Sequence, residues 1–188
     1  MNKKTVALTT EQYKEIIQTM KQGFSGCRPN ERIATALMLE ANLGIRISDI
    51  LKLKLTDIIR DGDRYRLSIT EQKTGKARVF TVPFALYQFI RCYCLDNGIA
   101  ASDIIFPITE RAVQKQLQIV CDYLSIPGVS THSFRKYYAT EIYRTNGYNI
   151  ALVQHLLQHC SATVTQRYIG IQQKEVEAAI EGHLYLNI

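Results

Sequence analysis

The chain has 188 residues, of which 46% are hydrophobic and 21% are charged, and these values are typical of a soluble globular protein with one domain. No apolar run is long enough to cross a membrane, and the start "MNKKTVALTT" lacks the apolar stretch of a secretory signal. There are 23 lysines and arginines against 17 acidic residues, a net charge of +6. The basic residues recur in short groups rather than in one block. This distribution is typical of a folded surface that follows a polyanion, and it does not suit a disordered basic tail.

The cysteines and histidines do not indicate a metal site. An odd number of cysteines, five, without paired spacing favours a reducing compartment. His155 and His159 have the i, i+4 spacing of zinc-binding helices, but Leu156 stands where a zinc protease has glutamate. We therefore expect ordinary thiols and histidines here, and no metal or cofactor.

The first predicted elements are helices. Thr9 or Thr10 can cap a helix whose apolar residues recur on one face as far as Met20. Asn30 can cap a second helix that extends through Leu43, and the following Gly44 stands where a helix-ending glycine is expected. A short third helix is predicted to begin near residue 48.

The pattern changes after residue 57. The segments "DGDRYRLSIT" and "KARVFTVP" are β-rich and flank "EQKTG", so they predict a β-hairpin that ends at Pro83. Apolar stripes then predict helices over 86–94, over 110–124, after a Ser130 or Thr131 cap, over 150–158, over "ATVTQRY" and over 176–184. The predicted fold class is mostly α with a small antiparallel β-sheet (α+β).

The segment "THSFRKYY" contains a candidate anion site. His132 and Arg135 are three residues apart, so they share a face of the predicted helix. They lie near its N-terminus, where free backbone N–H groups and the helix dipole favour an anion such as phosphate. Taken alone, the pattern is more typical of a capped surface helix with a partly buried histidine.

The segment "LGIRISDI" contains a second candidate. Arg46 follows a helix-ending glycine, and Asp49 stands three residues later, where it could hold the guanidinium by a charge-assisted hydrogen bond. The apolar neighbours suggest a half-buried arginine, which requires either a structural carboxylate or a ligand oxygen as its partner. Both interpretations remain open from the sequence.

Lys73 lies at the predicted tip of the hairpin, in "EQKTGKAR". A lysine in a turn is usually solvated and without function. If the hairpin leans over a cleft, however, the ammonium group could protonate a leaving oxygen.

Tyr168 lies in "LLQHCSATVTQRYIG", nine residues after His159. A tyrosine near a C-terminus most often serves in packing or in an interface. Its phenol, with an ordinary pKa of about 10, is a poor nucleophile at pH 7 unless neighbouring groups activate it. An aryl phosphoester is nevertheless a good leaving group, so a phosphotyrosine would preserve the energy of a broken phosphodiester without a nucleotide cofactor.

Together, Arg46, Lys73, His132-x-x-Arg135, His159 and Tyr168 form a set that is far more specific than any one of them. With this set the chain resembles the catalytic domain of tyrosine recombinases, in the phage-integrase branch. The resemblance is carried by "GIRISDILKL", "EQKTGKARVFTVP", "THSFRKYYAT" and "LLQHCSATVTQRYIG". It implies the catalytic-domain fold of that family over residues 1–170, followed by a C-terminal amphipathic tail helix over 171–188.

The resemblance implies metal-free cleavage of DNA at a single phosphate. Arg46 and Arg135 would hold its non-bridging oxygens, and Lys73 would protonate the 5′-oxygen leaving group. His132 would accept or orient a proton near the nucleophile. Asp49 matches the acidic position that usually follows the first arginine, where it would support that arginine.

The resemblance implies that Tyr168 attacks in line and forms a 3′-phosphotyrosyl link, while His159 hydrogen-bonds a phosphate oxygen. Two positions depart from the pattern common in the family: Gln158 stands where many relatives have glycine, and Lys136 follows the second arginine where many have histidine or another residue. We expect neither departure to affect a catalytic role.

The implied partner is double-stranded DNA, with a homo-tetramer when synapsed on DNA and a monomer or weak oligomer without it. The resemblance implies no membrane association and a cytoplasmic protein of bacterial or phage origin. Family members usually carry an N-terminal helical domain that closes a clamp around DNA, whereas this sequence begins at the catalytic domain. It is either an excised fragment or a naturally short homologue, and we expect a fragment. The tail helix is expected to pack on a neighbouring protomer when DNA is bound.

Two other functions remain open from the sequence. A type IB topoisomerase uses similar chemistry but relaxes supercoils without exchanging strands. A DNA-binding homologue without activity is the alternative that is not an enzyme, and the complete residue set argues against it.

Overall fold

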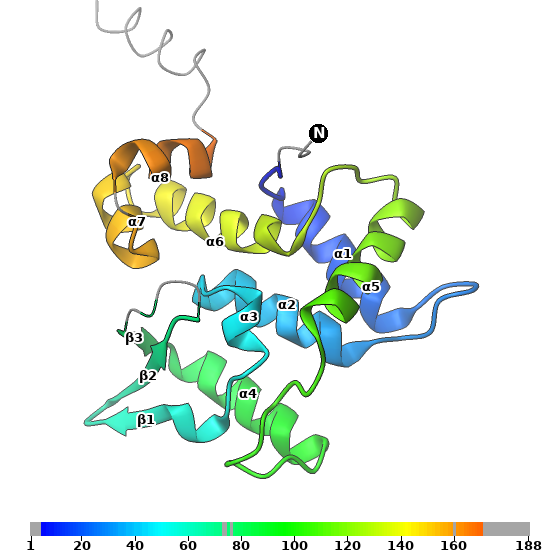
Figure 1. Ribbon diagram of the computed structural model, residues 1–188, viewed down its shortest axis with the longest axis horizontal. Coiled ribbons are helices and arrows are strands. Elements are labelled where there is room, and N and C mark those ends of the chain that lie inside the picture. The colour runs from blue at the N-terminus through cyan, green and yellow to red at the C-terminus, as the bar shows by residue number, and fades with distance from the viewer. Residues whose placement is uncertain (1–4, 73–74, 76, 160, 171–188) are drawn as a thin grey trace, which may run out of the picture.

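The computed structural model describes residues 5–72, 75, 77–159 and 161–170, except for the side chain of Arg167 (Figure 1). Helices predominate among the described elements. In chain order these elements are α1 (Thr10–Gln22), α2 (Glu31–Leu43), α3 (Ile47–Ile50), a 3-10 turn (Leu55–Asp57), β1 (Ile58–Asp61), β2 (Arg64–Thr70), β3 (Ala77–Val82), α4 (Phe84–Asp96), α5 (Glu110–Tyr123), α6 (Thr131–Thr145), α7 (Ile150–Leu157) and α8 (Ala162–Ile169).

Local capping signals set the ends of the first two helices. Thr9 is the N-cap of α1, where its hydroxyl accepts a hydrogen bond from the Gln12 N–H and the Gln12 side chain accepts one from the Thr9 N–H. The Asn30 side chain caps α2. Gly44 ends α2 in the left-handed conformation, with φ 62°. The sequence-based prediction of both helices is therefore confirmed.

The sheet has three antiparallel strands in the order β1-β2-β3, one strand more than the predicted hairpin. Strands β2 and β3 form that hairpin, with Leu67 opposite Phe80. The prediction omitted β1 because only its first residue, Ile58, is buried, so no alternation marks the strand. A two-residue turn joins β1 to β2, and its first residue, Gly62, has φ 62°, as such turns require.

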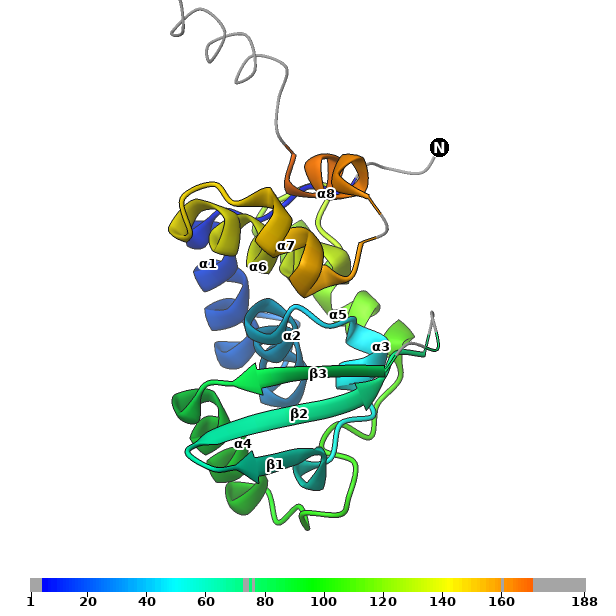
Figure 2. The ribbon, with the colours of Figure 1, turned by 90° about the vertical axis from the view of Figure 1, so that its left-hand side faces the viewer.

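Helix α2 runs through the centre of the molecule. Its residues are largely buried, and Leu37 and Leu39 are completely so. In Figures 1 and 2, α6, α7 and α8 lie on one side of α2, while the sheet and α4 lie on the other. A small second core, built around Ala139, Val153 and Leu157, joins α6, α7 and α8. The helical part and the sheet thus meet beside α2 and α3, where several of the predicted site residues lie.

Within the described ranges, no helix is both long and apolar enough to cross a membrane. The predicted tail helix over 176–184 lies outside the described residues.

Candidate active site

Arg46 lies at the turn between α2 and α3. The left-handed Gly44 ends α2, and Arg46 has extended backbone (ψ 149°) as the N-cap of α3. Arg46 Nη1 donates to Glu71 Oε2 at 2.5 Å, and the arginine side chain remains 18% exposed. One nitrogen of this guanidinium is therefore fixed by a carboxylate, while part of the group stays accessible.

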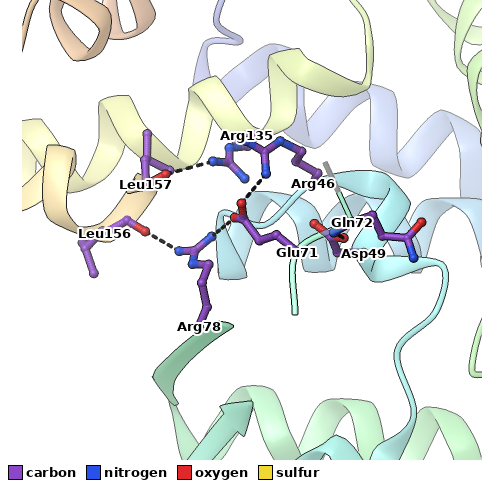
Figure 3. Close-up of polar contacts among 8 residues, drawn as sticks. All are labelled: Arg46, Asp49, Glu71, Gln72, Arg78, Arg135, Leu156 and Leu157. Carbon is purple, nitrogen blue, oxygen red and sulfur yellow. Dashed lines mark hydrogen bonds and ion pairs between the residues drawn. The ribbon is translucent and has the colours of Figure 1, made fainter. Parts of the chain in front are cut away.

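Arg135 lies on α6 and is almost completely buried, with 2% exposed. Its Nη2 donates to the Leu157 carbonyl at the end of α7 at 3.3 Å. Its Nη1 is also buried and has no hydrogen-bond partner among the described residues. Burial lowers the pKa of Arg135, but an arginine keeps its charge in a protein, so Nη1 is a charged donor available to an anion. Figure 3 shows the side chains of Arg135 and Arg46 beside each other above Glu71.

A buried ion pair lies next to Arg46, and the sequence motifs did not indicate it. Glu71 follows β2 and is 1% exposed, and Arg78 lies on β3 and is 5% exposed. Arg78 Nη1 donates to Glu71 Oε1 at 2.9 Å, and Nη2 donates to the Leu156 carbonyl (Figure 3). Glu71 therefore bridges two arginines with its two carboxylate oxygens.

One signal in the sequence could have revealed Arg78. On β3 it alternates with Phe80 and Val82 toward the inner face, while Val79 points outward and is 60% exposed. An arginine at an inward position of a strand requires an internal partner. The identity of that partner, Glu71, could not be read from the same pattern.

His159 directly follows the end of α7. Gln158 turns the chain there with φ 53° and ψ 39°, a left-handed conformation that glycine adopts without strain. His159 Nδ1 lies 3.0 Å from Thr165 Oγ1 on α8. Burial lowers the pKa of His159 to about 4, together with the positive charges of Arg135, Arg46 and Arg78. The imidazole is therefore neutral near pH 7.

Tyr168 lies on α8, one turn after Thr165. Its ring packs edge to face on His159, with the ring centroids 4.9 Å apart and an interplanar angle of 72°. The hydroxyl is buried and forms no hydrogen bond of good geometry with a described residue, although the Arg135 side chain lies close enough to act on it. Burial raises the pKa of Tyr168 to about 12, although the charges of Arg135 and Arg46 act in the opposite direction. The phenol is thus protonated in the free protein and electrostatically coupled to both arginines.

The two positions that depart from the common family pattern both lie next to these groups. Gln158 provides the turn before His159, as described above. The Lys136 ammonium lies 5.6 Å from the centroid of the Tyr168 ring and donates to the Thr5 carbonyl at 2.5 Å. Lys136 therefore contacts the ring of the proposed nucleophile, which the sequence-based interpretation did not foresee.

Asp49 does not hold Arg46, contrary to the charge-assisted bond considered from the sequence. Its Oδ1 accepts a hydrogen bond from the Gln72 N–H at 3.0 Å, and Glu71 holds the guanidinium instead. The side chain of Asp49, 6% exposed, therefore fixes the segment that follows β2.

Two other predicted site residues remain, His132 and Lys73. His132 is exposed in the first turn of α6, three residues before the buried Arg135. Lys73 lies outside the described residues. Their assignment therefore rests on the sequence motifs.

The charges of the cluster favour an anion. Among the described residues, Glu71 is the carboxylate that pairs with Arg46 and Arg78, and its charge also acts on Arg135. Glu40, fully buried on α2, has a pKa well above its ordinary value because of burial, which favours its neutral form, although the charge of Arg135 opposes this shift. Within the described residues, no group of three or more His, Cys, Asp or Glu side chains is placed to hold a metal ion.

A groove of about 790 Å³ gives solvent access beside this cluster. It runs between β3 and α7 and is lined at one end by Gln158 and His159. Strand β3 is an edge of the three-stranded sheet, so the groove is bounded by a strand edge on one side and by a helix on the other. A large ligand can therefore approach His159 without opening the core.

The sequence matches a known family over most of its length. The model of the phage integrase family matches residues 7–175. The probable integrase/recombinase YoeC of Bacillus subtilis (strain 168) is 30% identical over 172 residues, which cover 88% of this chain and 91% of YoeC. Tyrosine recombinase XerA of Pyrococcus furiosus is 28% identical over 185 residues, covering 93% of this chain and 60% of XerA. The chain thus spans nearly all of YoeC but only part of the longer XerA.

Solved structures show the same fold. The catalytic domain of bacteriophage HP1 integrase superposes with a TM-score of 0.66 at 16% identity, covering 96% of both chains. XerH recombinase in a post-cleavage complex with palindromic difH substrate superposes with a TM-score of 0.69 at 18% identity, covering 95% of this chain and 53% of XerH. The predicted class, mostly helical with a small antiparallel sheet, is confirmed. The chain therefore belongs to the phage integrase family, the family of the tyrosine recombinases.

Proposed function

We propose that this chain is the catalytic domain of a site-specific recombinase that cuts and rejoins double-stranded DNA through a 3′-phosphotyrosyl intermediate. The observation that carries the proposal is the cluster itself. It combines two arginines with accessible or unpartnered donors, a neutral histidine and a tyrosine hydroxyl, and the arginines act electrostatically on both other groups. The histidine, His159, lines the adjacent groove. The family membership and the post-cleavage DNA complex of XerH support the same chemistry.

In the proposed reaction, the Tyr168 oxygen bonds to the scissile phosphorus while the bond from phosphorus to the 5′-oxygen breaks. The phenol proton passes to a nearby acceptor, for which we propose His132, and Lys73 gives a proton to the departing 5′-oxygen. Arg46 and Arg135 hold the non-bridging oxygens, where negative charge increases in the transition state. Attack by a 5′-hydroxyl on the phosphotyrosine then restores a phosphodiester and releases the phenol.

His159 contributes through its neutral imidazole, which carries one N–H. The Thr165 hydroxyl can donate either to the Ser161 carbonyl at 3.4 Å or to Nδ1 at 3.0 Å, and when it donates to Nδ1 the imidazole proton resides on Nε2. That N–H can then donate to a phosphate oxygen without adding a further positive charge to the arginine cluster.

The test uses nicked duplexes with a randomised core, in which cleavage next to the nick releases a short strand and traps the adduct. Wild-type protein should form covalent adducts that survive denaturant, and sequencing the trapped DNA gives a duplex for all further assays. Tyr168→Phe should bind the same duplex but form no adduct, because it lacks the nucleophilic oxygen. An equal adduct yield from Tyr168→Phe would contradict the assignment of the nucleophile, and the absence of any wild-type adduct would contradict the proposed function.

Strand transfer between two such duplexes distinguishes a recombinase from a type IB topoisomerase, which relaxes supercoils without it. We further propose a homo-tetramer on synapsed DNA, with the 171–188 tail packing on a neighbouring protomer, and a cytoplasmic protein of bacterial or phage origin. The domain limits of 1–170 and 171–188 are part of this proposal. Relatives such as XerA are longer than the matched region, which is compatible with a further DNA-clamping domain in the whole protein.

A further inference from the structure

We propose that Glu71 and Arg78 are positioning residues, which fix Arg46 and the His159 turn relative to each other for the cleavage step. This inference rests on the proposed function. It assigns roles to two buried residues of the segment "EQKTGKARVFTVP" to which the resemblance gave none, and it holds that neither of them touches DNA.

The hydrogen bonds of Arg78 separate it from the two clamp arginines, Arg46 and Arg135. Both terminal nitrogens of Arg78 are used within the protein, one on Glu71 and one on the Leu156 carbonyl. Its guanidinium also lies 5.1 Å from the Phe80 ring centroid, and its side chain is 6% exposed. Arg135, by contrast, has an unpartnered Nη1 among the described residues, and Arg46 is partly exposed. Both terminal nitrogens of Arg78 are thus engaged within the protein, and its side chain is almost closed to solvent, so its remaining N–H groups are poorly accessible to a phosphate.

The network connects three parts of the chain that meet only through the tertiary fold. Arg46 and Glu71 are 25 positions apart, and Arg78 and Leu156 are 78 positions apart. The path runs from the start of α3, through the carboxylate after β2, to the inner face of β3 and the last turn of α7 (Figure 3). His159 follows α7 by two residues, so the path links the turn that carries it to Arg46.

Helix geometry explains why the end of α7 needs these arginines. The last carbonyls of an α-helix have no intrahelical partner, and they form the negative end of its dipole. Arg78 takes the Leu156 carbonyl and Arg135 takes the Leu157 carbonyl. Two buried cations thus fix the segment just before Gln158. The left-handed backbone of Gln158 then sets the direction in which the chain continues to His159.

Glu71 sets the position of the Arg46 guanidinium. It holds a single nitrogen, Nη1, at 2.5 Å and leaves the rest of the fork to a ligand. A phosphate clamp must place its donors accurately, because a displacement of about 1 Å can cost on the order of 100-fold in rate. A charged hydrogen bond from a buried carboxylate supplies that accuracy before DNA arrives.

The test measures two quantities for each variant: the rate of single-turnover cleavage of the selected nicked duplex at saturating DNA, and the affinity for that duplex. The variants are Glu71→Gln, Arg78→Met, Arg78→Lys and the Glu71→Gln/Arg78→Met double variant. Cleavage by Glu71→Gln and Arg78→Met should fall by about 10- to 100-fold, while Kd changes by less than about threefold. Arg78→Lys should recover part of the rate, because it keeps the charge and one donor. The double variant should be within about threefold of the slower single variant, because each change breaks the same path.

Arg66→Gln is the matched control. Arg66 pairs with Asp61 on the same sheet, but that pair is exposed, so the cleavage rate should stay at the wild-type level. Denaturant unfolding identifies any variant that fails to fold. If Arg78→Met fails to fold, the results for Arg78→Lys and Glu71→Gln decide.

Three results would each overturn the positioning role: unchanged cleavage, a loss of cleavage that parallels lost DNA affinity, or losses that multiply in the double variant. A wild-type protein that forms no adduct would instead overturn the proposed function on which it rests.

Discussion

At the scale of single residues, the titration of His159 makes the free energy of unfolding depend on pH. Burial and the neighbouring arginines lower its pKa to about 4, whereas an unfolded histidine titrates near 6.5. Between these two values the unfolded chain binds more protons than the folded chain, so the free energy of unfolding decreases as pH falls from about 6.5 toward 4. Above this window the stabilisation from neutral His159 is fully present.

We expect His159→Gln to show a shallower loss of stability over this window than the wild type, measured by denaturant unfolding at a series of pH values. Carboxylates that titrate in the same range are common to both proteins and cancel in the comparison. His155→Gln is the matched control, since His155 is exposed on the preceding helix, and it should reproduce the wild-type profile. Parallel profiles for wild type and His159→Gln would show that the folded protein does not hold this imidazole in its neutral form.

At the scale of elements, the turn between α2 and α3 places Arg46 through one glycine. Gly44 has φ 62°, and a Cβ there would overlap the ring of Tyr138 on α6. We expect Gly44→Ala to lower the free energy of unfolding by roughly 2–4 kcal/mol, combining the left-handed backbone cost with overpacking. DNA cleavage should fall as well, because Arg46 is two residues away.

Gly98→Ala is the control for this prediction. Gly98 has φ 63°, but nothing lies within 4 Å of a Cβ built there, so only the backbone cost of about 1–2 kcal/mol applies. Denaturant unfolding of both variants isolates the packing contribution against Tyr138. Equal losses of stability for the two variants would mean that Tyr138 moves aside without cost, and that the close approach of α2 and α6 does not depend on this glycine.

The elements that the sequence predicted are those with local signals. The caps at Thr9 and Asn30 and the glycine at the end of α2 act within a few residues, and the structure confirms them. Strand β1 lacks such a signal, because only Ile58 is buried. Apolar periodicity gives the type of an element, but it cannot report a strand that is exposed along most of its length.

The candidate site also contains some residues that the sequence indicated and others that it did not. The resemblance implied that Arg46 and Arg135 hold phosphate oxygens, whereas their short motifs taken alone left this open, and the structure places both arginines beside Glu71. Glu71 and Arg78 were not predicted, because their partners are distant in sequence and only the fold brings them together. The carboxylate that holds Arg46 proved to be Glu71 rather than the adjacent Asp49, which illustrates that a nearby carboxylate in sequence need not be the partner in space.

At the scale of the whole molecule, the net charge of +6 and the proposed DNA partner predict binding that weakens with salt. The logarithm of the association constant should fall linearly with the logarithm of salt concentration, with a slope set by the number of phosphates that the protein contacts. Measured on the selected duplex in a Tyr168→Phe background, this slope counts phosphate contacts without interference from cleavage.

The same slope separates the two classes of arginine. Replacing a residue that contacts a phosphate makes the slope shallower by about 1, so Arg46→Ala should do so in this background. Arg78→Lys should leave the slope unchanged, because the Arg78 side chain is buried and both of its terminal nitrogens bind groups of the protein. An equal change for both variants would place Arg78 on the DNA and remove its distinction from the clamp. Unequal changes would mean that the excess positive charge of the buried cluster acts on DNA through Arg46, while Arg78 acts within the protein.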